Sequence, residues 1–149
     1  MEERSVSLPA WSSSYIGIPY KPHARGPDSY DCFGFCRLIY KEEFGIELPA
    51  YDDQYADEME IESTLAIAND EDTPYFEVSM SEVHEGDLAL FASIRDVLHI
   101  AVILDKVHFI HLNSHVGTST IERIDAPIWR NRIIAIYRHK EIHLSKEDN

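Results

Sequence analysis

Three side chains of this sequence have the types needed for cysteine-nucleophile chemistry. Cys32 follows Asp31 where an apolar run of helical period begins, so we expect it in the first turn of a helix. There the helix dipole and the unpaired backbone N–H groups favour a thiolate and can stabilise an oxyanion. Such a nucleophile also needs an imidazole to take its proton and a polar group to orient that imidazole. His99 and His111 are the candidates for these two roles.

The spacing of His99 and His111 decides whether they can act together. Both lie in segments of strand-like composition that could form a hairpin. Their rings then share a face only if the loop has an odd number of residues. A three-residue loop of Leu104–Lys106 puts His99 directly opposite His111. A two-residue loop of Asp105–Lys106 puts them on opposite faces, and the sequence favours neither loop.

The elements that must position these residues are a helix and then a sheet. The helix is predicted to run from Asp31, a good N-cap, to Gly45, which stops it. After residue 87 the apolar period changes to that of strands. A helix followed by an antiparallel sheet is an α+β fold. The five predicted strands are Leu88–Phe91, Val97–Leu104, Val107–Asn113, Ser119–Ile124 and Ile133–Arg138.

Shorter elements are predicted around this framework. They are a short helix within residues 8–20 ending near Gly17, a loop over 21–29, a helix over 54–69 and a helical turn over 127–130. No repeat or linker divides the 149 residues, so we expect a single domain.

The composition argues against several kinds of partner. The formal net charge is −14, and residues 52–72 hold nine carboxylates without a lysine or arginine, which disfavours binding to nucleic acid or anionic lipid. We interpret this acidic segment as a solvated face. No stretch approaches 18 apolar residues, and residues 1–4 lack the start of a signal peptide, so we expect no membrane insertion and synthesis in the cytoplasm. The eight histidines lack zinc-site spacing, and no metal or other cofactor is predicted.

Six short motifs occur in order between residues 11 and 139. They are Gly17-Ile18-Pro19-Tyr20, Asp31-Cys32-Phe33-Gly34-Phe35, Gly86-Asp87-Leu88, Leu98-His99-Ile100-Ala101-Val102, Phe109-Ile110-His111 and Trp129-Arg130-Asn131-Arg132. Together they resemble the NlpC/P60 family of cysteine peptidases, especially its short phage-tail branch. Phe33 stands where that family usually has serine, and Leu104-Asp105 replaces the glycine that often ends its histidine strand.

The resemblance implies a papain-like α+β fold and a role for each motif residue. Cys32 would be the nucleophile, His99 the general base and then acid, and His111 the residue that orients His99. Contacts with the substrate or the oxyanion are implied for Tyr20 and Phe33. The remaining candidates for the cleft are Asp31, His115 and Trp129. Of these, the Asp31 carboxylate is expected to turn toward the helix backbone, and Trp129 is interpreted first as an apolar cap on the sheet.

The implied reaction is hydrolysis of an amide in peptidoglycan stem peptides through a thioester, usually between γ-D-glutamate and a diamino acid. Phage-tail proteins are implied as further partners, and the protein could travel with a tail. Two alternatives stay open. One is a non-catalytic tail-assembly factor on the same fold. The other is a cysteine amidase or acyltransferase with a different substrate.

Overall fold

The structure is a computed structural model, and it describes residues 8–21, 24, 26–48, 75–92, 98–112 and 116–142. The predicted helix over 54–69, the acidic segment 52–72 and His115 lie outside these residues. Within the described residues, no helix combines the length and the apolar character needed to cross a membrane.

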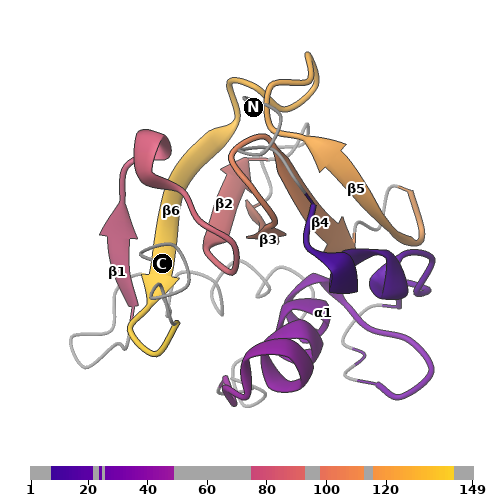
Figure 1. The fold of residues 1–149 in the computed structure, drawn as a ribbon. Helices are drawn as coiled ribbons and strands as arrows, with labels where there is room; N and C mark the ends of the chain where they lie inside the picture. The colour runs from indigo at the N-terminus through magenta and orange to yellow at the C-terminus, as the bar shows by residue number, and fades with distance from the viewer. Residues whose placement is uncertain are drawn as a thin grey trace.

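A six-stranded sheet forms the centre of the fold, and its paired strands run antiparallel (Figure 1). The strands are β1 (Tyr75–Val78), β2 (Leu88–Ala92), β3 (Leu98–Ile103), β4 (His108–Leu112), β5 (Ser119–Arg123) and β6 (Ile133–His139). Their order across the sheet is β1-β6-β2-β3-β4-β5. All five predicted strands are present. Strand β1 was not predicted, because four residues at a sheet edge are too short to show a period.

Helix α1 (Cys32–Ile39) packs against β3 and β4 (Figure 1). It begins at the predicted residue because Oδ1 of Asp31 accepts a hydrogen bond from the backbone N–H of Gly34 at 2.7 Å. The chain then continues as a π-helical turn, η3 (Tyr40–Phe44), and leaves it at Gly45 with a φ of 68°. The predicted stop is therefore confirmed, whereas the change of helix type leaves no mark in the sequence pattern.

Two smaller predictions are also confirmed. A 3₁₀ helix, η2 (Ala10–Tyr15), lies before Gly17. The backbone N–H groups of Trp129 and Arg130 both donate to the carbonyl of Ala126, at 2.9 and 2.8 Å, and form the helical turn before β6.

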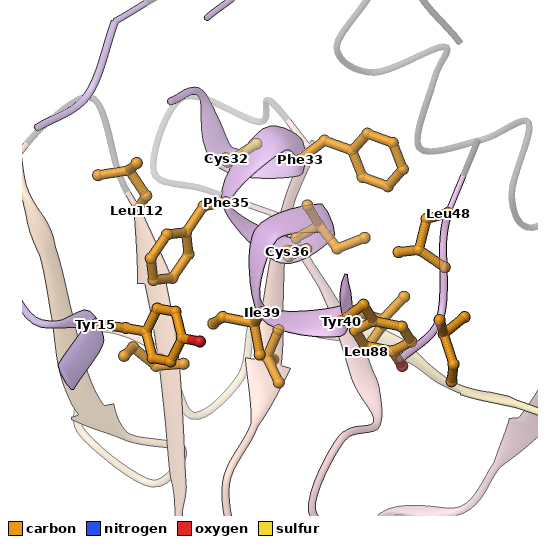
Figure 2. Close-up of a cluster of buried hydrophobic side chains, with 14 of the residues drawn as sticks. Tyr15, Cys32, Phe33, Phe35, Cys36, Ile39, Tyr40, Leu48, Leu88 and Leu112 are labelled. Atoms are coloured by element: carbon orange, nitrogen blue, oxygen red, sulfur yellow. The ribbon is translucent and has the colours of Figure 1, made fainter. Parts of the chain in front are cut away.

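The two faces of the sheet carry different clusters of side chains. The face toward α1 is apolar, and its members pack with the helix in one cluster that includes Cys32, Phe35, Ile100, Val102, Ile110 and Leu112 (Figure 2). The opposite face holds a second cluster, which includes Ala89, Phe91, Ala101, Phe109, Trp129 and Ile136. Because side chains alternate along a strand, His99 and His111 belong to this second face.

The hairpin between β3 and β4 has the odd-length loop that a shared histidine face requires. Ile103 pairs with Phe109, and the N–H of Leu104 donates to the carbonyl of His108 at 2.9 Å, so the loop is residues 105–107. This is one residue later than the loop that would set the two histidines directly opposite each other.

The shifted loop changes which residue faces His111. Extending the register puts Ala101 opposite His111 and makes His99 its diagonal neighbour. The cause is Asp105, whose Oδ1 accepts hydrogen bonds from the N–H groups of Val107 and His108, both at 2.8 Å. An aspartate that bonds the backbone two and three residues ahead fixes a turn without glycine.

Candidate active site

His99 and His111 form a buried pair of imidazoles on the sheet face away from α1. Nε2 of His99 lies 2.7 Å from Nδ1 of His111, and the two side chains are 7% and 0% exposed. Burial, with a smaller contribution from the neighbouring His111, holds the pKa of His99 well below its ordinary value. His99 is therefore neutral at pH 7, and Nδ1 is the ring nitrogen that the bond to His111 does not use.

A third side chain extends this pair. Oε2 of Glu122, on β5, lies 2.7 Å from Nε2 of His111. That hydrogen bond, and a further one from Trp129, lower the pKa of Glu122 below its usual range although partial burial opposes them. Glu122 is a carboxylate at neutral pH.

Sequence reasoning missed Glu122. The sequence did show that Glu122 lies in a predicted strand, on the same face as Thr120 and on the opposite face from the apolar Ile121. Glu122 pairs with Phe109 across β4 and β5, and Phe109 lies on the same face of β4 as His111. This register is what puts Glu122 on the face of His111. Several registers of these strands are compatible with the sequence, so the signal was insufficient by itself.

Trp129 closes the site on the side away from the sheet. Its ring is stacked on His99 with a centroid distance of 6.1 Å and an angle of 24°, and it meets His111 edge-on at 5.4 Å. Its Nε1–H donates to Oε1 of Glu122 at 2.8 Å. The residue is 4% exposed and belongs to the second cluster, as expected of a cap on the sheet.

Cys32 is the first residue of α1 and is 2% exposed. Figure 2 shows Cys32 at the N-terminal end of the helix and Cys36 one turn further along. Leu112, the residue after His111, packs in the same cluster as Cys32 and lies toward that end of the helix in this view. Strand β4 packs against α1, and both contribute to this cluster. The approach of a His99 nitrogen to the Cys32 sulfur stays a prediction.

The other cysteine of this helix has a different environment. Cys36 is fully buried, and this burial, together with the charge of Asp31, raises the pKa of its thiol. It is a neutral core residue, as its position one turn below Cys32 predicted.

Tyr20 is held close to the chain segment that enters α1. Its N–H donates to the carbonyl of Gly117 at 2.9 Å, and it forms a parallel bridge with Tyr30, two residues before Cys32. The N–H of Tyr30 in turn donates to the carbonyl of Pro19 at 3.1 Å. A role of Tyr20 in binding substrate stays a prediction.

The two residues flanking Cys32 are buried. The carboxylate of Asp31 turns to the helix backbone, as expected, and the side chain of Phe33 is 0% exposed in the helix-side cluster. What Phe33 could offer a substrate is therefore its backbone N–H in the first helical turn. Among the described residues, no group of three or more histidine, cysteine or acidic side chains is arranged to hold a metal ion.

The sequence matches those of known proteins over most of its length. The model of the NlpC/P60 family matches residues 17–138. The murein DD-endopeptidase MepS/murein LD-carboxypeptidase of Escherichia coli is 25% identical over 122 residues, which are 80% of this chain and 55% of that protein. Protein P54 of Enterococcus faecium is 24% identical over 106 residues, 71% of this chain and 17% of that protein. The chain spans about half the length of the Escherichia coli protein.

Solved structures resemble the fold. The NlpC/p60 domain of the peptidoglycan hydrolase SagA superposes with a TM-score of 0.57 at 19% identity, covering 87% of this chain and 93% of that one. An NlpC/P60 family protein from Bacillus cereus gives a TM-score of 0.60 at 19% identity, covering 90% of this chain and 41% of that one. These likenesses confirm the predicted papain-like α+β fold.

Proposed function

Since the chain belongs to the NlpC/P60 family, we propose that it is a cysteine peptidase that cleaves an amide bond in bacterial cell-wall peptides. The observation that carries the proposal is the 2.7 Å hydrogen bond between the buried rings of His99 and His111. Burying two imidazoles on an apolar sheet face costs free energy. The hydrogen bond between them lets His111 orient His99, which would act as the general base. The names of the murein endopeptidase and the peptidoglycan hydrolase among its relatives support the substrate class.

In the proposed reaction Cys32 attacks the carbonyl carbon of the amide. Its thiol proton passes to Nδ1 of His99, and the tetrahedral intermediate collapses to a thioester while His99 returns that proton to the leaving amine. A water molecule then attacks the thioester, with His99 again taking a proton, and the carboxylic acid product leaves Cys32 free. His111 would hold the ring of His99 in place through Nε2 during both steps.

Three features support an encounter between Cys32 and His99. His99 is the second residue of β3, so its ring is close to a strand end rather than in the middle of the sheet. Helix α1 packs on the other face of β3 and β4, and Leu112 joins the end of β4 to the cluster that contains Cys32, so Cys32 would meet His99 around the strand ends. Nδ1 of His99 is the nitrogen that the bond to His111 leaves for a proton from sulfur.

The bond that is cut is the finer part of the proposal. We favour the bond between γ-D-glutamate and the diamino acid. The relative in Escherichia coli is named for DD and LD bonds, so the same assay must separate these three cleavages. Product masses do this, because each bond divides the stem peptide at a different residue.

The test is digestion of purified peptidoglycan and defined muropeptides, containing either diaminopimelate or lysine, by the wild type and by Cys32→Ala. We expect fragments from the wild type and none above background from the variant, because nucleophile and base act as a unit. Cys36→Ala is the matched control on the same helix and should retain turnover, since Cys36 is a core residue. EDTA should leave the rate unchanged.

Cleavage by Cys32→Ala at the wild-type rate, or loss of cleavage in EDTA, would contradict the cysteine mechanism. If the wild type cuts none of the wall peptides, a tail-assembly role or a different amide substrate becomes the better proposal. Binding to phage-tail proteins is then the next measurement.

A further inference from the structure

Glu122 is bound at both of its carboxylate oxygens. Oε2 lies 2.7 Å from Nε2 of His111, and Oε1 accepts the Nε1–H of Trp129 at 2.8 Å. Glu122 pairs with Phe109 across β4 and β5, which sets it on the same sheet face as His111. Its side chain is 25% exposed, whereas that of His111 is fully buried.

The hydrogen bond between the two histidines has no direction of its own. Either Nε2 of His99 donates to Nδ1 of His111, or Nδ1 of His111 donates to Nε2 of His99. Both arrangements fit the observed separation of 2.7 Å. Only the first leaves Nδ1 of His99 with a lone pair that can take a proton from Cys32. In the second, that nitrogen already carries a proton.

The carboxylate removes this ambiguity, because it can only accept hydrogen bonds. Nε2 of His111 must therefore carry a proton to bond Glu122. When His111 is neutral, its Nδ1 then has a lone pair and accepts from Nε2 of His99. We propose that Glu122, held by Trp129, is a positioning residue. It sets the donor and the acceptor of each hydrogen bond along the line of Glu122, His111 and His99, and so makes Nδ1 of His99 the proton acceptor. The part that concerns Cys32 rests on the proposed function.

Trp129 is suited to hold Glu122 because it touches every member of the chain. It stacks on His99, meets His111 edge-on and donates its indole N–H to Glu122. A phenylalanine at this position would keep the ring contacts but lose the hydrogen bond. Trp129→Phe therefore separates the cap on the sheet from the support of the carboxylate.

The first test observes protons rather than turnover. ¹⁵N NMR of the imidazoles at pH 8, well above the value of about 6.5 where an ordinary histidine titrates, reports which nitrogen of each ring carries the proton. In the wild type we expect the proton on Nε2 in both His99 and His111. In Glu122→Gln the amide can donate as well as accept, so we expect a mixture of tautomers in both rings.

The second test follows the pH dependence of Cys32 alkylation by iodoacetamide. The titratable groups that this test involves are Asp31, which precedes Cys32 on α1, and the hydrogen-bonded line of His99 on β3, His111 on β4 and Glu122 on β5. Because the Glu122 carboxylate favours a proton on the imidazole chain, it favours the thiolate–imidazolium pair. In Glu122→Gln the inflection should move to higher pH, and kcat/KM should fall by about 10-fold to 100-fold. Trp129→Phe should show a smaller shift in the same direction.

Asp125→Asn is the matched control. It also removes one carboxylate near the end of β5, but Asp125 is exposed and bonded to Arg123 at 2.9 Å. It should leave the tautomers, the alkylation profile and turnover unchanged. If Glu122→Gln does not fold, the tautomers in the wild-type spectrum and the alkylation profile of Trp129→Phe still test whether Glu122 sets the proton positions.

A neutral His99 that carries its single proton on Nδ1 in the wild type would overturn the proposal. So would unchanged tautomers in Glu122→Gln. These results are independent of peptidase activity, since they are measured on the resting protein. If the tautomers depend on Glu122 but no wall peptide is cut, the proton direction stands and the proposed function fails.

Discussion

The ion pair of Asp87 and Arg138 and the hydrogen-bonded line of Glu122, His111 and His99 both lie on this sheet, and their hydrogen bonds are completed in different ways. Asp87 accepts two bonds from Arg138, at 2.8 and 2.9 Å, and one from the N–H of His84 at 2.8 Å. Arg138 also donates to the carbonyl of Glu82 at 2.7 Å. Both oxygens of the carboxylate are engaged, and its charge is neutralised by its partner. This pair ties β6 to the start of β2.

The chain of Glu122, His111 and His99 is not closed in this way. Its bonds run in one line from the carboxylate to Nε2 of His99, and the last nitrogen, Nδ1, is outside that line. Burial lowers the pKa of His99 with no opposing charge among the described residues, and it raises the pKa of Asp87 although Arg138 opposes this shift. A closed pair holds strands together, whereas an open chain ends on a group that can exchange a proton. The comparison predicts that substitutions will divide cleanly between stability and activity.

The largest effect should come from His99→Ala. Turnover of a wall peptide should fall by at least about 10³-fold, since the general base and the nucleophile act as one unit. The free energy of unfolding should fall by only about 1–3 kcal/mol, because Nδ1 of His111 loses its partner. Kinetics and urea unfolding of the same preparation measure both. A loss of stability with turnover retained would place His99 in the same class as the ion pair.

Asp87→Asn should give the opposite result. It leaves Arg138 without its counter-charge in a buried position, which costs about 3–5 kcal/mol of unfolding free energy. Turnover per folded molecule should be close to that of the wild type at a temperature where the variant is folded. Lys41→Gln is the control, because Lys41 and Glu47 form an exposed pair at 3.9 Å, and such pairs contribute about 0–1 kcal/mol. Equal destabilisation by the two substitutions would contradict the structural role of Asp87.

The ion pair and the histidine chain also differ in what the sequence could predict of them. Asp31 as a cap, Gly45 as a stop and the alternation of each strand depend on neighbours in the chain, and these predictions are confirmed. The shared face of His99 and His111 needed only the parity of one loop. Even there, Asp105 moved the loop by one residue and made the two histidines diagonal neighbours.

The remaining contacts depend on pairings between distant segments. The bond from Glu122 to His111 requires the register of β4 and β5, and Asp87 finds Arg138 across 51 positions of the sequence. Asp87 belongs to the motif Gly86-Asp87-Leu88, which is part of the resemblance to the family, but the sequence assigned no role to its carboxylate. Local patterns locate elements, whereas partners of buried polar groups follow from register, which the sequence does not state.

His111 should tolerate change better than His99. His111→Ala should lower turnover by about tenfold or more, because the ring of His99 loses the group that orients it. His111→Asn should retain more activity than alanine, since an amide can still accept from Nε2 of His99. Steady-state kinetics of the two variants provide the comparison. If asparagine is no better than alanine, His111 contributes through packing rather than through its hydrogen bond.

The smallest expected effect is on the pH dependence of stability. His99 has a lowered pKa in the folded protein, so near pH 6 the unfolded chain binds a proton at this residue and the folded protein does not. Stability that is present above the unfolded value of about 6.5 is therefore lost as the pH falls below it. For this one group the loss is about 1 kcal/mol between pH 6.5 and 5.5. In His99→Phe that part of the decline should vanish. The pKa of His139 is also lowered by burial, but His139 is present in both proteins and cancels in the difference. Urea unfolding at several pH values measures the two curves, and parallel curves would show that His99 is protonated equally in the folded and unfolded states.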